Sequence, residues 1–188
     1  MSDSPHSLQE IDISVAEPYQ QELSEDWLRM VMEAALVEAL PQSEPAQVGL
    51  VVTDDETVQE LNRRFRGLDE VTDVLSFSAS HSGHWEGDPL ESQQSDEASQ
   101  ESEDAEELNF VLPPGEPSPL GEVIISFPQT IRQAQERNGP VKQELALLIV
   151  HGVLHLVGYD HMEPEDEAQM QAKERSALAA VSQLEAGI

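Results

Sequence analysis

The sequence predicts a single domain of the α+β class, with its elements in the order β-α-β-α-β-β-α-α-α. The chain has 188 residues, of which 38% are hydrophobic, so it is long and apolar enough to build one core. Apolar residues alternate with polar ones in the segments predicted as strands and recur at helical spacing in the segments predicted as helices. Turn and capping residues separate these segments and support the order.

The first half of the chain is predicted to alternate strands and helices. Residues 11–15 form the first strand, and Ser24 caps a helix that continues up to Pro41. A β-rich run at 46–53 forms the second strand. The helix that follows has acidic residues at its start, arginines near its end and Gly67 as its stop.

The second half is predicted to contain two strands and then three helices. The strands are 73–78 and 121–127. Pro128 can open the first helix, and a Gly-Pro pair after Asn138 ends it. The last two helices, one strongly apolar and one amphipathic, cover 141–158 and 163–187.

A long polar segment separates the two strands of the second half, at about residues 80–118. It is rich in Ser, Gln, Glu and Pro, and its part from 86 to 116 carries eleven acidic residues without any Lys or Arg. Such a composition cannot bury enough apolar surface to offset the entropy of ordering, so we predict a disordered acidic insertion. The expected organisation is a flexible N-terminus at 1–9 and one domain at 10–188, which the insertion interrupts.

The composition excludes several kinds of site. The chain has no cysteine, which excludes disulfides, cysteine-based zinc sites and thiol nucleophiles and leaves imidazole and carboxylate groups as metal ligands. We expect a cytoplasmic protein without a membrane anchor. The N-terminus lacks a signal-peptide pattern, and no apolar run approaches the roughly 20 residues that a membrane span needs.

The formal net charge of -29 argues against nucleic-acid binding by the whole surface, because an acidic surface repels phosphate. Positive charge must therefore be local if the protein binds nucleic acid. Of the nine Lys and Arg residues, Arg63, Arg64 and Arg66 fall within the run RRFR. For Arg63 and Arg64 a solvated helix end is an equally good interpretation, because cations stabilise the C-terminal end of a helix.

The run HGVLHLVGYDH, from His151 to His161, contains three of the six histidines. His151 and His155 are four residues apart, so a helix presents both on one face. Gly158 can take the left-handed conformation that ends a helix, which lets the chain return His161 as a third nitrogen ligand. Three nitrogens with an open fourth position are typical of a catalytic zinc site, so the spacing predicts a metal site at the end of this helix.

Two alternative roles for the histidines carry less weight. A single histidine is usually a core residue bonded to backbone groups, but three in an apolar helix would cost roughly 1–3 kcal/mol for each nitrogen left without a partner. The metzincin proteases share the spacing H-x3-H-x2-G-x2-H and have a glutamate base after the first histidine. This chain has Gly152 there, so it lacks the group that activates water in those proteases.

Three segments, HGVLHLVGYDH, LNRRFRGLDEVTDVLSF and LGEVIIS, resemble the YbeY-type endoribonucleases, which are also described as rRNA maturation factors. The similarity covers about residues 10–184 apart from the insertion. It implies a mixed four-stranded sheet with helices around it and a zinc site that opens into a cleft. It also implies one Zn2+ per chain, held by His151, His155 and His161, with Arg66 as the functional, catalytic arginine.

The chain departs from the family at one position near the site. The family usually has Gly-Asp where this chain has Gly121-Glu122. Glu122 either takes part in the site with its longer side chain or lies on the surface of an edge strand. Asp160 is open to two interpretations as well, because it can orient a histidine or form the turn that leads to His161.

The resemblance implies a zinc-dependent endoribonuclease, specific for single strands, that acts in rRNA maturation and ribosome quality control. Zinc held by three neutral imidazoles lowers the pKa of its water to about 7, and Arg66 can pair with phosphate. The expected partners are RNA and, beyond it, ribosomal proteins or the small subunit. The alternatives are a non-catalytic ribosome assembly factor with structural zinc and a metal-dependent hydrolase of another substrate. Either water or the RNA 2'-hydroxyl can be the nucleophile.

Overall fold

The computed structural model describes residues 9–41, 44–79, 116–161 and 163–187. The predicted N-terminal segment at 1–9 and the predicted insertion at about 80–118 lie outside the described residues, apart from Gln9 and residues 116–118. The described elements follow the predicted order. They are β1 (Gln9–Val15), a 3-10 helix (Glu17–Tyr19), α1 (Glu25–Ala39), β2 (Ala46–Thr53), α2 (Asp55–Arg66), β3 (Val74–Ser78), β4 (Ser118–Ser126), α3 (Phe127–Glu136), α4 (Val141–Leu156) and α5 (Pro164–Ala186).

The four strands form one mixed sheet in the order β1-β2-β4-β3. β1, β2 and β4 are parallel to one another, and β3 runs antiparallel to β4. β4 begins three residues earlier than the sequence predicted, at Ser118. Its register with β2 shifts by one residue, because Gln47 pairs with Pro119 and Val48 pairs with Gly121. The expectation of a mixed four-stranded sheet in an α+β domain is confirmed.

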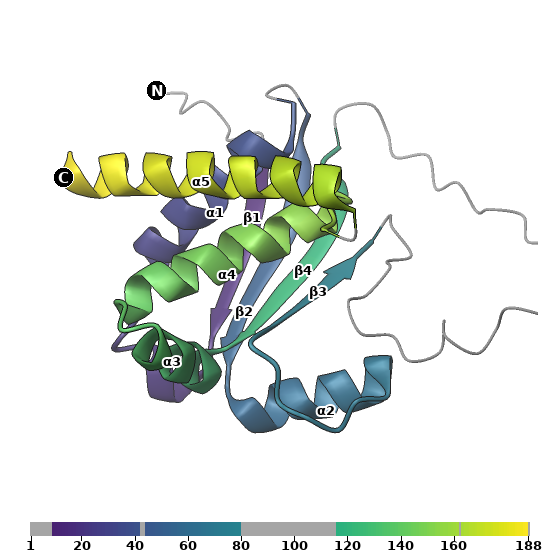
Figure 1. Ribbon diagram of the computed structural model, residues 1–188, viewed down its shortest axis with the longest axis vertical. Helices are drawn as coiled ribbons and strands as arrows, with labels where there is room; N and C mark the ends of the chain where they lie inside the picture. Colours follow the sequence, from purple (N-terminus) through teal and green to yellow (C-terminus); the bar gives the residue numbers. More distant parts are fainter. Residues whose placement is uncertain (1–8, 42–43, 80–115, 162, 188) are drawn as a thin grey trace, which may run out of the picture.

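The helices cover the two faces of the sheet unequally (Figure 1). α1 and α4 lie on one face, and α5 crosses over both of them on the outside. The main core fills the space between that face and these helices, with fully buried side chains such as Leu28, Leu50, Val123, Ile149 and Met170. α2 packs on the opposite face over β3 and β4, where it forms a smaller cluster from Val58, Leu75 and Ile124.

α4 is held closely against the sheet by its contacts with β3 and β4. The Ser76 hydroxyl donates to the carbonyl of Gly152 at 3.1 Å, and the Ser78 hydroxyl donates to the carbonyl of Leu156 at 2.9 Å. A Cβ atom on Gly152 would lie 2.6 Å from Cγ1 of Val123, so only glycine lets the helix backbone come this near to β4. These contacts fix the position of the last two turns of α4, which carry two of the histidines.

The starts of α1 and α2 are capped by side chains, at the predicted Ser24 and at Asp54. Ser24 accepts a hydrogen bond from the Trp27 N–H, and Asp54 accepts one from the Thr57 N–H, so both act as N-caps. Gly67 has a φ of 71°, the left-handed conformation that ends α2 directly after Arg66. None of the helices in the described ranges has the length and apolar character that crossing a membrane requires.

Candidate metal centre and its cleft

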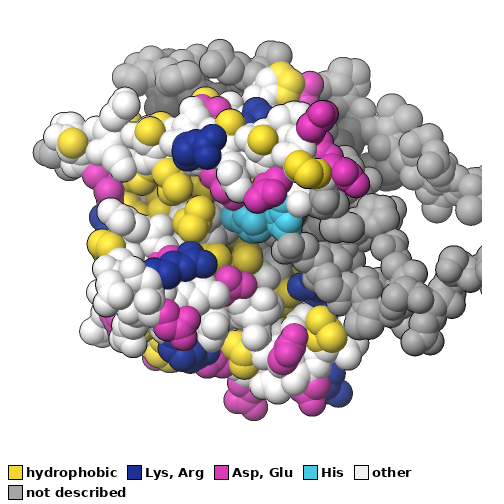
Figure 2. Space-filling model, viewed as in Figure 1, with side chains coloured by type: hydrophobic (Ala, Val, Ile, Leu, Met, Phe, Trp, Pro, Cys, Tyr) yellow, Lys and Arg dark blue, Asp and Glu magenta, His cyan; other side chains and the backbone are white. Residues whose placement is uncertain are grey.

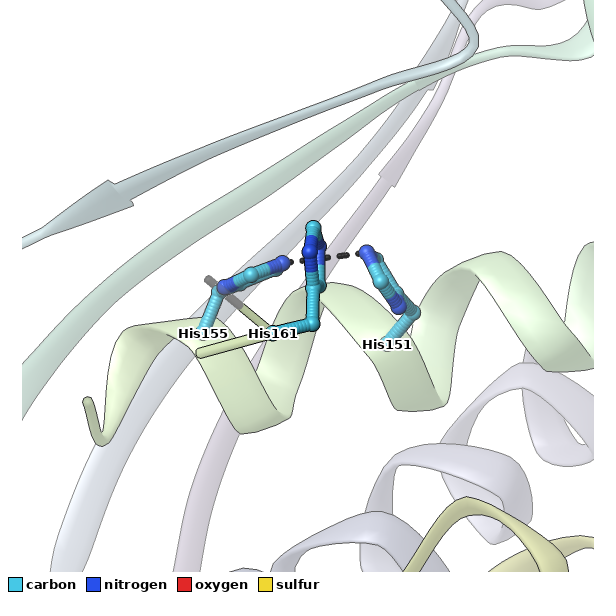
Figure 3. A group of neighbouring side chains, drawn as sticks. All are labelled: His151, His155 and His161. Carbon is cyan, nitrogen blue, oxygen red and sulfur yellow. Dashed lines mark hydrogen bonds between the residues drawn. The ribbon is translucent and has the colours of Figure 1, made fainter. Parts of the chain in front are cut away.

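The three histidines converge at the C-terminal end of α4 (Figure 3). His151 and His155 project from one face of the helix, as their four-residue spacing predicted. The helix ends at Leu156, and Gly158 takes a φ of 88° while the Tyr159 N–H donates back to the Leu154 carbonyl. This turn reverses the chain and places His161 beside the other two, so the predicted role of Gly158 is confirmed.

The geometry of the three imidazoles fits a metal ion. One nitrogen from each ring lies within 4.8 Å of the others, and Nε2 of His151 is 3.0 Å from Nε2 of His155. Nitrogens around tetrahedral zinc are about 3.3 Å apart, given Zn–N bonds of about 2.0–2.1 Å. The group could therefore hold a metal ion with small side-chain adjustments. A fourth ligand position would face the cleft that the three rings line.

Burial keeps one of these imidazoles, that of His155, neutral. Burial, with smaller contributions from the adjacent imidazoles of His151 and His161, lowers the pKa of His155 to about 4. His155 is therefore neutral at pH 7. Metal ions bind the neutral imidazole, because the lone pair must be free of a proton.

Glu174 on α5 is a further residue of the site, and no sequence pattern indicated it. Its Oε1 lies 2.8 Å from Nδ1 of His151, and both side chains are mostly buried. A proton on Nδ1 leaves the lone pair on Nε2, the nitrogen that faces His155. α5 is fixed beside α1 at this point, since the Lys173 ammonium and the Ser176 hydroxyl both donate to Glu38.

A cleft of about 650 Å³ opens in front of the histidines. Figure 2 shows the histidine side chains in this hollow, with acidic side chains next to them and basic ones farther away. The wall from α5 and the turn before it contributes Asp160, Glu167 and Glu174. The opposite side includes Arg66, at the end of α2, so the structure brings the predicted arginine into the same cleft as the histidines.

The loop after α2 helps to set the position of Arg66. The Asn62 side-chain amide donates to the Glu70 carbonyl at 2.9 Å, and the Gln59 amide donates to Asp69 at 3.0 Å. Both bonds tie the loop back onto α2. Arg63 and Arg64 in the last turn of α2 are exposed and do not line the cleft, which agrees with a solvated helix end.

For Glu122 and Asp160 the sequence left two roles open, and the structure favours one of them in each case. Glu122 is exposed on the α2 side of the sheet, where it covers Gly49, and is not among the residues that line the cleft. It is a surface residue, but β4 is a central strand and not an edge. Asp160 accepts a hydrogen bond from the backbone N–H of His161, which supports its role in the turn.

The comparisons with known proteins agree on one family. A sequence model of the family described as Endoribonuclease YbeY matches residues 10–182. The chain is 37% identical to the protein of that name from Roseiflexus sp. (strain RS-1), with 96% of each chain covered. It is also 37% identical to the one from Dehalococcoides mccartyi (strain CBDB1), with 93% of this chain and 95% of the relative covered.

A solved structure shows the same fold. The solution structure of TM1509 from Thermotoga maritima superimposes with a TM-score of 0.55 at 22% sequence identity. The match covers 94% of this chain and 93% of that one. The arrangement of sheet and helices is therefore shared over nearly the whole length of both chains.

Proposed function

The chain belongs to the YbeY endoribonuclease family, and from this premise we propose that it is a zinc-dependent endoribonuclease that cleaves single-stranded segments of rRNA. The observation that carries the proposal is the convergence of three imidazoles and one arginine on a single cleft. His151, His155 and His161 would hold one Zn2+ per chain, and Arg66 would contact the substrate.

The chemistry of the cleft suits phosphodiester cleavage. Zinc bound by the three imidazoles would supply positive charge beside the scissile phosphate and favour a deprotonated nucleophile at neutral pH. The Arg66 guanidinium can pair with two phosphate oxygens and stabilise the charge that develops on them. Glu174 keeps the His151 ring in one tautomer, so that ligand needs little reorganisation.

The arrangement around Gly152 argues against a metzincin-like peptidase. A Cβ atom at this position would lie 2.6 Å from Cγ1 of Val123 and 3.2 Å from Oγ of Ser76, in the close contact between α4 and the sheet. The helix therefore cannot carry the glutamate base of those enzymes without moving away from the sheet. An RNA phosphodiester can use its own 2'-hydroxyl as nucleophile, which is already held next to the phosphorus, and a bound metal would favour its deprotonation.

The biological setting is part of the same proposal. We infer that rRNA precursors are the substrate, that ribosomal proteins or the small subunit are partners, and that the protein acts in the cytoplasm. The curated relatives support the endoribonuclease activity through their names. A net charge of -29 supports a narrow contact with RNA, with a ribosomal partner supplying further positive charge.

A side-by-side cleavage assay tests the proposed activity. Labelled single-stranded rRNA segments and labelled casein should be incubated with the zinc-loaded protein, with and without a chelator. We expect RNA cleavage that chelation and His155→Ala abolish, and no cleavage of casein.

An arginine comparison is the control for folding in the same assay. Arg66→Ala should abolish cleavage without a change in zinc content or melting temperature, and Arg66→Lys should restore it poorly, because an ammonium cannot pair with two oxygens. Arg63→Ala removes the same charge outside the cleft and should cleave normally. Zinc-dependent proteolysis with intact RNA would refute the proposal.

A further inference from the structure

The two sides of the cleft differ in charge. Three carboxylates lie on one side, and two arginines with one carboxylate, that of Asp73, lie on the other. Asp160, Glu167 and Glu174 lie on the side of α5. All nine Lys and Arg residues of the chain belong to the described part, and two of them line the cleft. These two are Arg66, at the end of α2, and Arg137, directly after α3.

Arg137 lines the cleft, but the proposed mechanism does not use its guanidinium. Its Nη1 donates to Oε1 of Glu144 at 2.6 Å, and the Glu144 side chain is only 8% exposed. The Arg137 side chain itself is 59% exposed. A guanidinium has five N–H donors, so one contact with a buried carboxylate fixes its position and leaves donors that face solvent and the cleft.

Arg132, on α3, is an arginine with a structural role and provides a comparison. Its guanidinium donates to Asp55 and, through two nitrogens, to Gln129. It does not line the cleft. Both guanidinium groups pair with a carboxylate and are exposed, so the feature that distinguishes Arg137 is its position on the cleft.

We propose that Arg137 binds a second phosphate of the RNA strand, so that the backbone follows the wall from Arg66 to Arg137 as it passes the histidines. The inference rests on the proposed endoribonuclease function. Phosphates are attracted to the two guanidinium groups and repelled by the three carboxylates near α5, while the carboxylate of Asp73 accepts a hydrogen bond from the Gln133 amide. The sugar and base edges, which carry hydrogen-bond donors, then face the carboxylates of the acidic wall.

The test compares two pairs of substitutions that change the charge equally. Arg137→Gln with Glu144→Gln removes the cleft cation without leaving a buried carboxylate unpaired. Arg132→Gln with Asp55→Asn is the matched control outside the cleft. For each zinc-loaded protein, kcat and KM for a single-stranded RNA are measured at several salt concentrations, together with the melting temperature.

We expect the Arg137 pair to raise KM about 3- to 10-fold with little change in kcat, as for the loss of one exposed charge-assisted contact. The plot of log(kcat/KM) against log(salt) should become shallower by about 0.7, the value for one phosphate on a single strand. The control pair should keep the wild-type KM and slope. Arg137→Lys should keep the slope and raise KM less, which guards against an unfolded double variant.

The possible outcomes distinguish failure of this inference from failure of the proposed endoribonuclease function. A wild-type KM and slope in the folded Arg137 variants, or equal changes in both pairs, would overturn the second phosphate contact and leave the nuclease proposal intact. A fall in kcat alone would also overturn it, because that result indicates positioning of the reacting groups. Absence of RNA cleavage by the wild type would instead reject the proposed function.

Discussion

The sheet face beneath α4 is closed, whereas the opposite face is half open. On the closed face, hydroxyl groups of β3 bind the backbone of α4, and Gly152 lets the helix approach β4. On the open face, α2 covers only part of β3 and β4, so Glu122 of β4 is exposed, as are Glu10 and Asp12 of β1. The three imidazoles lie above the closed face, two on α4 and the third in the turn that follows it.

The difference between the faces explains where a metal site can form. Metal ligands must stay within fractions of an ångström of their binding geometry, so they need side chains on a rigid element with supporting contacts. The closed face supplies such an element in α4, with Glu174 as a support. The exposed carboxylates on the strands of the open face repel phosphate.

The largest effect should come from removing the support of the metal site. Glu174→Ala should weaken metal affinity about 10- to 100-fold, because the His151 ring loses the partner that fixes its tautomer. Glu174→Gln should weaken metal affinity less, because the amide oxygen of the glutamine can still accept a hydrogen bond from Nδ1 of His151. The measurement is zinc competition against a chromogenic chelator. Glu167→Gln, a charge change in the same cleft without a histidine contact, is the control, and equal affinities in all four proteins would refute the role of Glu174.

The close approach of α4 to the sheet should be sensitive to one methyl group. Gly152→Ala should lower the free energy of unfolding by about 1–3 kcal/mol, because the new Cβ overlaps Val123 and this outweighs the helix propensity of alanine. Urea unfolding measures the change. Gly139→Ala, where a Cβ meets nothing within 4 Å, should stay within about 0.5 kcal/mol of wild type. If both substitutions had the same effect on stability, the inference that α4 packs closely against the sheet at Gly152 would be wrong.

The attachment of α2 should be pH-dependent and weak. Hydrogen bonds from Arg132 and then Ser126 hold the pKa of Asp55 below its usual 3.8, against the opposing effect of burial. A lowered pKa stabilises the fold above the unfolded value, and this stability disappears as the pH falls through the folded value. Asp55→Asn should therefore cost under about 1 kcal/mol at pH 7, since both partners are partly exposed.

The pH profile of that variant provides the check. The difference in unfolding free energy between wild type and Asp55→Asn should shrink below about pH 4, where the carboxylate becomes protonated. Urea titrations at pH 7 and at acidic pH measure it. A difference that grows toward acidic pH would contradict the lowered pKa.

The smallest effect is expected at Glu122 on the open face. Glu122→Gln should leave the RNA cleavage rate within about twofold of wild type and the stability within about 0.5 kcal/mol, because the side chain is exposed and outside the cleft. Cleavage kinetics and urea unfolding test this. A loss of activity without a loss of zinc would show that the carboxylate reaches the site after all.

The sequence predicted the parts of the fold that local physics determines. Capping residues such as Ser24 and the stop at Gly67 set helix ends within one or two residues, because these preferences depend on neighbouring backbone groups. The start of β4 at Ser118 was missed. Pro119 and Gly121 favour a loop, and pairing with β2 overrides that preference.

The candidate site was predictable in its ligands and not in its supports. His151, His155 and His161 lie within one helix and its turn, so their spacing alone brings them together. Glu174 and Arg137 approach from other elements, and nothing in their local sequence distinguishes them from surface charges. The spacing of residues along α5 could have identified Glu174 as the partner of His151 only if the packing of α5 against α4 had been known.

The most direct test of the central claim is the amount of zinc bound per chain. Elemental analysis of wild type and of His151→Ala, His155→Ala and His161→Ala, with Glu122→Gln as the control from the open face, addresses the ligands one by one. We expect about one zinc per chain in the wild type and the control, and a large loss in each histidine variant, because three imidazoles and one open position make up the site. Full zinc occupancy in any one of the three histidine variants would contradict the account.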